Sequence, residues 1–443
     1  DLRLLAERFA PFLGRTPAQW LLARGAGVVI AAYEVAVVSA IVQLSLALPM
    51  AMYFHRATLQ ALPANVIAVP LTVLLMPSAL AALALSSISA WMAKPFALLA
   101  GAALDGMADS ATLLGTDLRV ATPEAAICTV AAGTLALAIW SARRRVVLAA
   151  TGVAAVAASA LWITAVPPHP QFQPGMLEVT AIDVGQADSI LVVSPDGRTL
   201  LVDAAGSIGP GVSEFDFGED VISPYLWERG ITRLDAVAVT HAHSDHIGGM
   251  GSIIKNFQPR ELWVGPNVLT RQFTALLRQA SVQNVAVIYR RGGDSFRFGE
   301  AEVQVLSPPA DWKLAKRVRN DDSLVFRIAY KESSAVLAAD AERRSERAIA
   351  ALPAESVRAD LLKVSHNGSA TSTTPEFLAA IQPKLAVISV GFRNQFRHPR
   401  PEVLERLSEQ RVATYRTDTA GAVTFYLDGK SAQAVRLGNV SLR

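Results

Sequence analysis

Long apolar runs occupy the first 166 residues of the chain. A membrane-spanning helix needs about 20 mostly apolar residues, and several runs have that length or come close to it. A further run, Ala18–Met52, is apolar but is interrupted by charged and polar side chains, so it predicts either a tilted span or an amphipathic helix at the membrane surface. We therefore predict a transmembrane bundle of about four helices, preceded by this stretch, with spans at Ala64–Ile88, Pro95–Leu114, Ala125–Ser141 and Val146–Val166.

The pattern changes from Leu177 onward, where short β-branched runs alternate with turn residues and with helical stretches. Strands are predicted at Leu177–Asp183, Ser189–Val193, Thr199–Asp203, Leu234–Thr240, Glu261–Val264, Ala286–Tyr289, Glu302–Leu306, Ser323–Ala329, Ala335–Ala339, Leu361–Val364 and Leu385–Ser389. Helices are predicted at Ile222–Arg229, Gly248–Phe257, Thr270–Gln279, Ser345–Leu352, Thr374–Ile381 and Pro401–Glu409. Many strands with covering helices indicate an α/β sandwich rather than an all-β barrel.

A proline-rich segment separates the two patterns. Residues 167–176 contain Pro167, Pro168, Pro170 and Pro174, which favour a short, stiff linker. The predicted organisation is therefore a transmembrane region at 1–166, a linker at 167–176 and an α/β domain at 177–443.

Charge is distributed unevenly between these parts. Residues 1–166 hold ten Lys or Arg and seven Asp or Glu, whereas residues 167–443 hold 31 of each. The formal net charge of +3 thus lies in the apolar part, which excludes a single soluble enzyme and a uniformly basic nucleic-acid binder. The one cysteine, Cys128, excludes a disulfide framework and a zinc site built from thiols. No signal peptide is visible after Asp1, and we expect the chain to be the distal piece of a longer polypeptide.

A cluster of three arginines, Arg143–Arg145, lies between the last two predicted spans. Short cytoplasmic loops carry an excess of Lys and Arg, so this turn is predicted to lie in the cytoplasm. The last span then leaves on the opposite face. The domain that follows is therefore expected on the extracytoplasmic side.

Histidine and aspartate gather after several predicted strands of the second part. The densest group is His241-Ala-His243-Ser-Asp245-His246, and imidazole with carboxylate is the ligand set of a catalytic zinc site without thiols. One ion cannot accept all four side chains without crowding, so the group favours two adjacent metal ions. Further apolar runs lead into Asp340, His366 and His398. We predict that these side chains meet at one edge of the sheets.

The group His241-Ala-His243-Ser-Asp245-His246 resembles the HxHxDH signature of metallo-β-lactamase-fold hydrolases. Other segments are similar to the ComEC family of DNA-internalisation competence proteins: Ile182–Ser189, Asn320–Val325, His366–Ser369, Ser389–Gly391, Asn394 and His398-Pro399 in the second part, and Leu48–His55 and Ala64–Pro70 in the first. The resemblance covers the family's second half and implies an αββα sandwich behind a transmembrane channel segment. It places the chain in the bacterial inner membrane as a multi-pass protein.

The resemblance implies a ligand set for two divalent ions, zinc or manganese. One ion would be held by His241, His243 and His366, a second by Asp245, His246 and His398, and Asp340 would bridge them, with Asp245, His246 and Asp340 as the catalytic group. Asp183 would orient a ligand histidine, and Asp188, Asn367 and Ser369 would surround the ligands. The chain departs from the family pattern at Asn367, where histidine is common, at Ala187, where glycine is common, and in the two alanines before Asp340.

Two metal ions suit phosphodiester hydrolysis, although lactams and thioesters are cleaved at similar sites. A set of basic residues could follow a phosphate backbone: Arg290, Arg291, Arg297, Lys313, Lys316, Arg317 and Arg319. Aromatic residues that could stack on bases are sparse near them, with Phe296, Phe298 and Trp312 as the nearby examples.

The function implied is DNA uptake in natural transformation, with a nuclease domain that degrades one strand. The expected partners are single-stranded or double-stranded DNA, membrane lipid, the upstream half of the same polypeptide and other DNA-uptake proteins. Two alternatives stay open. In one, the domain guides DNA and its metal site is not catalytic; in the other, the protein is a membrane-tethered hydrolase of a small ester or lactam.

Overall fold

The computed structural model describes residues 15–58, 60–114, 118–142, 146–207 and 215–436. The chain divides into two compact units, Asp1–Pro167 and Pro168–Arg443, which we call the helical unit and the sandwich unit. The division falls inside the stretch 167–176 that the sequence predicts as a linker. Each unit is described by itself.

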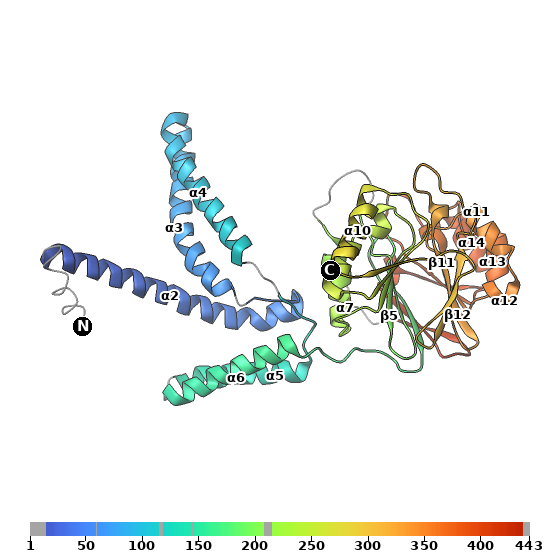
Figure 1. Ribbon diagram of the computed structural model, residues 1–443, viewed down its shortest axis with the longest axis horizontal. Coiled ribbons are helices and arrows are strands. Elements are labelled where there is room, and N and C mark those ends of the chain that lie inside the picture. Colours follow the sequence, from blue (N-terminus) through green and yellow to red (C-terminus); the bar gives the residue numbers. More distant parts are fainter. Residues whose placement is uncertain (1–14, 59, 115–117, 143–145, 208–214, 437–443) are drawn as a thin grey trace. The chain divides into compact units, whose positions relative to one another are not determined.

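Helices make up nearly all of the described helical unit (Figure 1). A short antiparallel pair, β1 (Arg56–Ala57) with β2 (Leu118–Arg119), interrupts them. Helices α3 and α4 pack against each other, as do α5 and α6. Their bounds are α2 Arg15–Tyr53, α3 Ala61–Ser86, α4 Ala90–Leu114, α5 Ala125–Ala142 and α6 Val146–Ala165.

Two of the described helices, through Leu22–Tyr53 and Leu62–Ser86, are long and apolar enough to cross a membrane. The apolar stretches of α5 and α6 are shorter, and α4 carries Lys94, Asp105 and Asp109. The sequence alone leaves open whether the first run is a span or an amphipathic surface helix. The successive residues Val28, Val29 and Ile30 of α2 are all exposed, so apolar side chains surround this helix, which favours a span. The arginine cluster Arg143–Arg145, on which the predicted orientation rests, lies outside the described residues.

Two sheets form the sandwich unit. The first has the strand order β17-β16-β3-β4-β5-β6-β7-β8, with bounds β3 Leu177–Ala181, β4 Ile190–Val193, β5 Thr199–Val202, β6 Ala236–Val239, β7 Glu261–Val264, β8 Ala286–Tyr289, β16 Val423–Leu427 and β17 Ala432–Arg436. The second has the order β15-β14-β13-β12-β11-β10-β9, with bounds β9 Ser295–Phe298, β10 Ala301–Ser307, β11 Val325–Tyr330, β12 Ser333–Leu337, β13 Leu361–Lys363, β14 Leu385–Ile388 and β15 Ala413–Arg416.

Parallel pairing matters for the position of the loops. Strands β5 to β8 are mutually parallel, and so are β12 to β15. The loops that follow neighbouring parallel strands therefore leave each sheet at the same edge.

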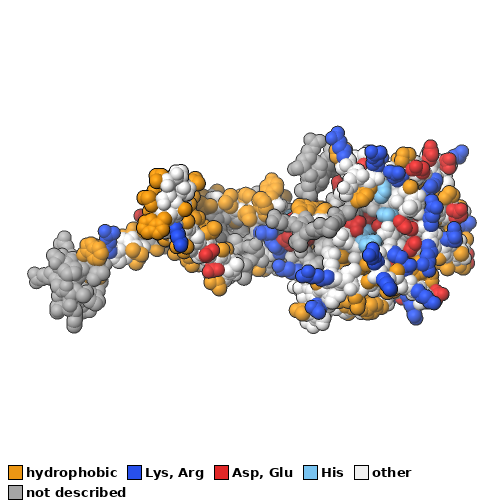
Figure 2. Space-filling view, turned by 90° about the horizontal axis from the view of Figure 1, so that it is seen from above, with side chains coloured by type: hydrophobic (Ala, Val, Ile, Leu, Met, Phe, Trp, Pro, Cys, Tyr) orange, Lys and Arg blue, Asp and Glu red, His pale blue; other side chains and the backbone are white. Residues whose placement is uncertain are grey.

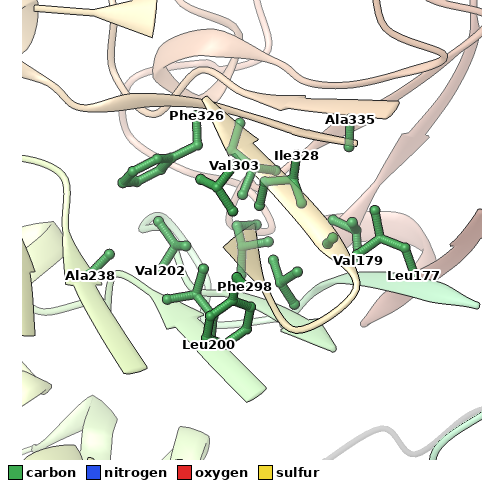
Figure 3. Packing of buried hydrophobic residues seen from close by; sticks show 14 of the residues in the cluster. Leu177, Val179, Leu200, Val202, Ala238, Phe298, Val303, Phe326, Ile328 and Ala335 are labelled. Atoms are coloured by element: carbon green, nitrogen blue, oxygen red, sulfur yellow. The ribbon is translucent and has the colours of Figure 1, made fainter. Parts of the chain in front are cut away.

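The main core lies between the two sheets (Figure 3). Leu200 and Val202 of the first sheet face Val303 and Phe326 of the second. In β11, Phe326 and Ile328 belong to this core while Val325 packs on the other side, because successive side chains of a strand point to opposite faces. The second sheet is therefore apolar on both faces.

Helices cover the outer face of each sheet, so the unit has four layers (Figure 1). Helices α7 and α10 lie beside the first sheet, and α11 to α14 lie beside the second. Behind the second sheet, Val336 and Leu362 pack with Phe377 of α13. The helix bounds are α7 Ser223–Glu228, α8 Ser244–Ile247, α9 Met250–Phe257, α10 Arg271–Val282, α11 Arg343–Ala350, α12 Ala354–Val357, α13 Pro375–Ile381, α14 Pro401–Glu409 and α15 Thr417–Ala420, with the short turns η1 Gly218–Ile222, η2 Asn320–Asp322 and η3 Ser365–Gly368. The predicted αββα sandwich behind a helical region is confirmed.

Candidate metal centre

The predicted ligands follow parallel strands of both sheets. His241, His243 and His246 come after β6 of the first sheet, and Asp340 comes after β12 of the second. His366 lies in η3 directly after β13, and His398 lies in the loop after β14. The topology thus brings segments that are far apart in the sequence to one edge of the sandwich.

A buried triad forms the centre of this edge. His241, His246 and Asp340 each offer a ligand atom, and these atoms lie within 4.8 Å of one another. The Nε2 atom of His246 is 3.3 Å from Oδ2 of Asp340. His243 joins the triad from the surface side, with its Nδ1 atom 2.9 Å from Nε2 of His241.

The triad contains polar atoms without a hydrogen-bond partner among the described residues. These are Nε2 of His246 and Oδ1 of Asp340, and both are buried. A buried polar atom without a partner is costly, so this arrangement is expected where another group completes the site. Imidazole nitrogen and carboxylate oxygen are the ligands that zinc binds in catalytic sites. The donor set therefore fits a divalent metal ion.

Asp203 orients His246. The Nδ1 atom of His246 is 2.7 Å from Oδ2 of Asp203, and Thr240 donates to the same carboxylate through its backbone N–H at 2.8 Å and its hydroxyl at 2.7 Å. A carboxylate on the outer ring nitrogen of a ligand histidine fixes its tautomer and leaves the other nitrogen free for a metal. His241 is held similarly, since Thr240 and Ser323 place their hydroxyls 3.2 Å from its Nδ1 atom.

The sequence assigns this orienting role to Asp183, and the structure gives it to Asp203. Asp183 is exposed and accepts a hydrogen bond from the Gly185 N–H at 3.3 Å, as a turn residue does. No contact between Asp183 and a histidine occurs among the described residues. Asp203 directly follows the strand β5, which pairs with β6, and β6 leads into Thr240 and His241. Asp203 could have been found in the sequence because it is a carboxylate at the end of a predicted strand. Asp183 has the same position in another predicted strand, so the sequence alone does not decide between the two.

The remaining predicted ligands lie around the triad at greater distances. His366 has its Nε2 atom 3.7 Å from Oδ2 of Asp340, and its Nδ1 atom 3.2 Å from Oε1 of Glu342. The rings of His366 and His398 have centroids 5.8 Å apart. Asp245 lies in the first turn of α8 with a partly exposed side chain, and no contact with the triad is found in the described part of the chain. Asn320 and Glu342, which the sequence analysis did not single out as site residues, both reach His366.

Three more predicted residues occupy the surroundings. Asp188 forms a fully buried ion pair with Lys363 of β13, and its carboxylate lies with Asp203 and His246 in a second group of possible ligand atoms. Asn367 donates to the Ser389 carbonyl at 2.8 Å. The Ser369 hydroxyl is 3.0 Å from that of Thr371, so in this structure both polar side chains serve the backbone and loops beside the ligands.

The charges at the centre shift several pKa values. Burial alone would lower the pKa of His246, but Asp340 and Asp203 outweigh it and hold this pKa well above its usual value. Burial, reinforced by the nearby His246, lowers the pKa of His241 well below the usual value. Burial also lowers the pKa of His398 to about 4, with His366 and Arg400 adding to the shift. His241 and His398 are therefore neutral near pH 7, as metal ligands must be.

Basic side chains surround the histidines on the surface of the sandwich unit (Figure 2). The loop before η2 carries exposed Lys313, Lys316 and Arg317 and leads directly into Asn320, whose amide is 3.3 Å from Nδ1 of His366. Part of the predicted set of basic residues therefore lies on the segment that leads into the metal centre.

The aromatic residues predicted as stacking partners are engaged inside the protein. Arg290 lies over the Phe296 ring, 3.6 Å from its centroid, and Phe298 is buried in the core. The Trp312 ring has the guanidinium of Arg319 at 5.3 Å and that of Arg344 at 4.1 Å from its centroid, and its N–H donates to Oδ1 of Asp322 at 2.8 Å. These contacts hold the basic loop in place, so the three rings serve the protein's own packing.

Two family models match this chain. One describes the metallo-beta-lactamase superfamily and matches residues 182–391, and the other describes a competence protein and matches residues 2–145. The first part of this chain is thus similar to competence proteins, and the second part is similar to the metallo-beta-lactamase superfamily. The order of the two regions, helical first and sandwich second, is the one that the sequence resemblance implied.

Curated relatives of this chain include the "ComE operon protein 3" of Bacillus subtilis, which is 28% identical over 88% of this chain and 51% of its own length. The "Recombination protein 2" of Haemophilus influenzae is 30% identical over 58% of this chain and 30% of its own. A shorter match, 38% identical over 20% of this chain and 16% of the relative, is to "Ribonuclease J" of Mycolicibacterium smegmatis. The chain thus spans about half or less of the length of these relatives.

Among solved structures, the metallo-beta-lactamase fold protein YhfI from Bacillus subtilis is 14% identical and covers 54% of this chain and 95% of its own, with a TM-score of 0.37. The competence match and the apolar helices indicate that this chain is associated with a membrane. The buried histidines and aspartate would hold a divalent ion, which would supply Lewis acidity that lowers the pKa of water and polarises a phosphoryl or carbonyl oxygen. The sandwich unit is accordingly a metal-dependent hydrolase fold.

Proposed function

We propose that the sandwich unit cleaves phosphodiester bonds of DNA while the protein takes part in DNA uptake across the bacterial inner membrane. Two divalent ions, zinc or manganese, would act together. His241, His243 and His366 would hold one ion, and Asp245, His246 and His398 the other. Asp340 would bridge them.

The buried triad carries this proposal. Among the described residues, Oδ1 of Asp340 and Nε2 of His246 form no hydrogen bond although both atoms are buried; Nε2 lies 3.3 Å from Oδ2 of Asp340, and Asp203 fixes the His246 ring. A site that orients its donors but leaves them unpartnered suits a metal that works on a substrate better than a packing role. His366 and His398 lie close enough to contribute to a second ion after small side-chain movements.

The basic loop supports a phosphate-bearing substrate. Lys313, Lys316 and Arg317 are exposed on the segment that ends at Asn320, beside His366. A polyanion that follows these cations would pass the metal centre. A small lactam or ester is too short to follow several of these cations at once.

The relatives support a role with DNA. Two of them are named "Competence protein ComA" and "Recombination protein 2", and a third is named "Ribonuclease J". Because this chain spans half or less of those proteins, the complete uptake activity would require an upstream half of the polypeptide. Lipid and other DNA-uptake proteins are the further partners that we propose.

We also propose that the sandwich unit lies on the extracytoplasmic side of a multi-pass membrane region. The arginines 143–145 support this orientation by their position between the last two apolar runs. A reporter that is active only outside the cytoplasm, fused after Arg443, should then be active. An inactive reporter on a stably expressed fusion would reverse the orientation.

Cleavage of labelled DNA tests the central proposal. The full chain in detergent is incubated with single-stranded DNA in Mn²⁺ or Zn²⁺, beside the double variant Asp245→Ala/His246→Ala and the control Glu409→Ala, an exposed carboxylate at the end of α14. The wild type and the control should cleave the strand. The double variant should lose at least about 100-fold in rate, since it removes two ligands of one ion.

The outcomes separate the alternatives. Equal cleavage by all three proteins, or cleavage by none, would contradict the nuclease proposal. DNA binding without cleavage would favour the DNA-guiding alternative. Turnover of a small ester or lactam, together with indifference to DNA, would favour the tethered hydrolase.

A further inference from the structure

The loop between β14 and α14 exposes two aromatic rings next to the metal centre. It reads Gly391-Phe-Arg-Asn-Gln-Phe-Arg-His398, and its last residue is a predicted ligand. The Phe392 side chain is 70% exposed and that of Phe396 is 39% exposed. Arg393 and Arg397, which follow the two rings, are exposed as well. Rings and cations thus alternate along this loop, which we call the Phe–Arg loop (residues 391–398).

The Phe–Arg loop is held in a fixed shape. The Asn394 amide donates to the carbonyls of Gly391 at 3.0 Å and His398 at 2.6 Å, and its oxygen accepts the His398 N–H at 2.9 Å. One side chain therefore ties the two ends of the loop together. Phenyl rings on such a loop stay exposed because they cannot fold back freely onto the core.

Gln186, which lies between β3 and β4 of the first sheet, contacts both ends of the Phe–Arg loop. The Gly391 N–H donates to Oε1 of Gln186 at 3.1 Å, and the Gln186 amide nitrogen is 3.4 Å from Nδ1 of His398. A Cβ atom on Gly391 would lie 2.8 Å from the Gln186 backbone nitrogen, so this close approach requires glycine. The loop and the predicted ligand His398 are thus positioned as one piece.

The rings are close to the ligand side chain itself. The centroids of Phe396 and His398 are 5.8 Å apart, with an angle of 31° between the planes. The Arg393 guanidinium lies 5.1 Å from the centroid of the Phe392 ring. A flat group resting on Phe396 would lie beside the predicted ligand His398, and one resting on Phe392 would lie beside the Arg393 cation.

We propose that the Phe–Arg loop is a stacking platform for the unpaired bases of a single-stranded nucleic acid. Phe392 and Phe396 would each stack on a base, and Arg393 and Arg397 would contact the phosphates between them. This inference rests on the proposed function and adds the substrate class: the site takes single strands in preference to duplex. In a duplex the base faces are already stacked on each other and cannot reach the rings.

The charge pattern favours this occupant over a lipid surface. The loop carries two Phe-Arg pairs separated by Asn394 and Gln395, so each ring has a cation next to it, as each base along a strand has a phosphate. The platform is also fixed to His398, so a strand bound there presents its backbone to the metal centre. A membrane would gain nothing from that position, and other exposed apolar side chains of the unit, such as Leu269 and Val282, lie on separate elements.

Binding of matched probes tests the platform. The full chain in detergent, with EDTA present so that no strand is cut, is titrated with labelled oligo(dT) of about 12 nucleotides and with an abasic strand of the same length. The variant F392L/F396L keeps apolar side chains but removes the rings, and F392W/F396W keeps aromatic rings. Val282→Ala is the surface control on α10.

The wild type should bind oligo(dT) more tightly than the abasic strand and more tightly than a duplex of the same length. The leucine variant should lose about fivefold or more in affinity for oligo(dT) per ring, since stacking on an aromatic side chain contributes that much per base. Its affinity for the abasic strand should not change, because that strand has phosphates but no bases. The tryptophan variant should bind oligo(dT) like the wild type.

Three results would contradict the platform. The wild type could bind oligo(dT) and the abasic strand equally well, or the leucine variant could lose the same affinity for both probes. The third is that the leucine substitutions change only the binding to vesicles of anionic lipid. The last result would assign the loop to the membrane. Cleavage in Mn²⁺ is measured separately on the wild type. Ring-dependent binding without cleavage would contradict the proposed nuclease and support the platform. Cleavage without ring-dependent binding would support the nuclease and contradict the platform.

Discussion

Replacing Asp203 with asparagine changes one atom of a side chain that accepts three hydrogen bonds at the metal centre. Asp203 receives the N–H and the hydroxyl of Thr240, and its Oδ2 atom is 2.7 Å from Nδ1 of His246. An asparagine that still accepts from the Thr240 N–H would turn its NH₂ group toward His246. The Nδ1 atom of His246 would then have to accept, which moves the ring proton to Nε2.

That proton would sit on the atom that a metal needs. Nε2 of His246 is buried, forms no hydrogen bond within the described part of the chain, and lies 3.3 Å from Oδ2 of Asp340. Loss of a residue that orients a metal-ligating histidine typically costs 10- to 100-fold in metal affinity. We therefore expect Asp203→Asn to weaken the binding of Zn²⁺ or Mn²⁺ by about that factor, or about 1.4–2.7 kcal/mol.

The matched control is Asp183→Asn, since Asp183 also follows a strand of the first sheet but is exposed and accepts only from Gly185 among the contacts found in the described chain. Metal affinity is measured on the full chain in detergent by competition with a chromophoric chelator. Circular dichroism of each variant confirms that the fold is retained. Equal metal affinities of Asp203→Asn and the wild type, or a loss in Asp183→Asn as large as that in Asp203→Asn, would refute the assignment of the orienting role to Asp203.

Two further predictions concern stability. Arg229 donates to both carboxylate oxygens of Glu178, which is 1% exposed. Arg229→Met would leave this buried carboxylate unpaired and should lower the free energy of opening of strand β3 by about 3–5 kcal/mol. Amide hydrogen exchange of β3 measures this free energy. The double variant Arg229→Met/Glu178→Met should recover most of this loss, and an equal loss in both variants would contradict the reasoning. His398 has a pKa of about 4 when folded and about 6.5 when unfolded, so the metal-free chain should lose stability as the pH falls from about 6.5 toward 4. In EDTA, the fall in the thermal midpoint between pH 7 and pH 5 should be smaller for His398→Gln, and parallel pH profiles would contradict this.

Local patterns predicted the strands that carry the site but not the strands that complete the sheets. The apolar runs around β5, β6, β12 and β13 are buried on both faces, so they appear in the sequence as continuous hydrophobic segments. Strands β15, β16 and β17 follow the last predicted strand and were missed. Strand β16 is stabilised by pairing with β3, more than 240 residues earlier in the chain, and no local window contains that information.

The same limit explains why the sequence could not decide which of two aspartates at strand ends, Asp183 or Asp203, orients a ligand histidine. The contiguous group from His241 to His246 was identifiable because its spacing is itself the signal. Asp183 and Asp203 follow similar predicted strands, and the strand order β3-β4-β5-β6 decides between them. Asp203 directly follows the strand beside β6, whereas Asp183 follows a strand two positions farther away. Phe392 and Phe396 were overlooked for a related reason, because a loop has no periodicity from which exposure can be inferred.

The positions of the ligands also couple metal binding to the packing of the sandwich. His241 and His246 come from the first sheet and Asp340 comes from the second, so an ion held by the triad joins the two sheets at their common edge. The buried pair of Asp188, in the loop between β3 and β4, and Lys363, at the end of β13, joins the sheets at the same edge without a metal. A ligand that binds only the folded state, present at 100 times its dissociation constant, stabilises that state by about 2.7 kcal/mol. Because the triad exists only when both sheets are in place, the free energy of metal binding would stabilise the packing of one sheet on the other. In the metal-free protein, the Asp188–Lys363 pair joins the sheets at this edge.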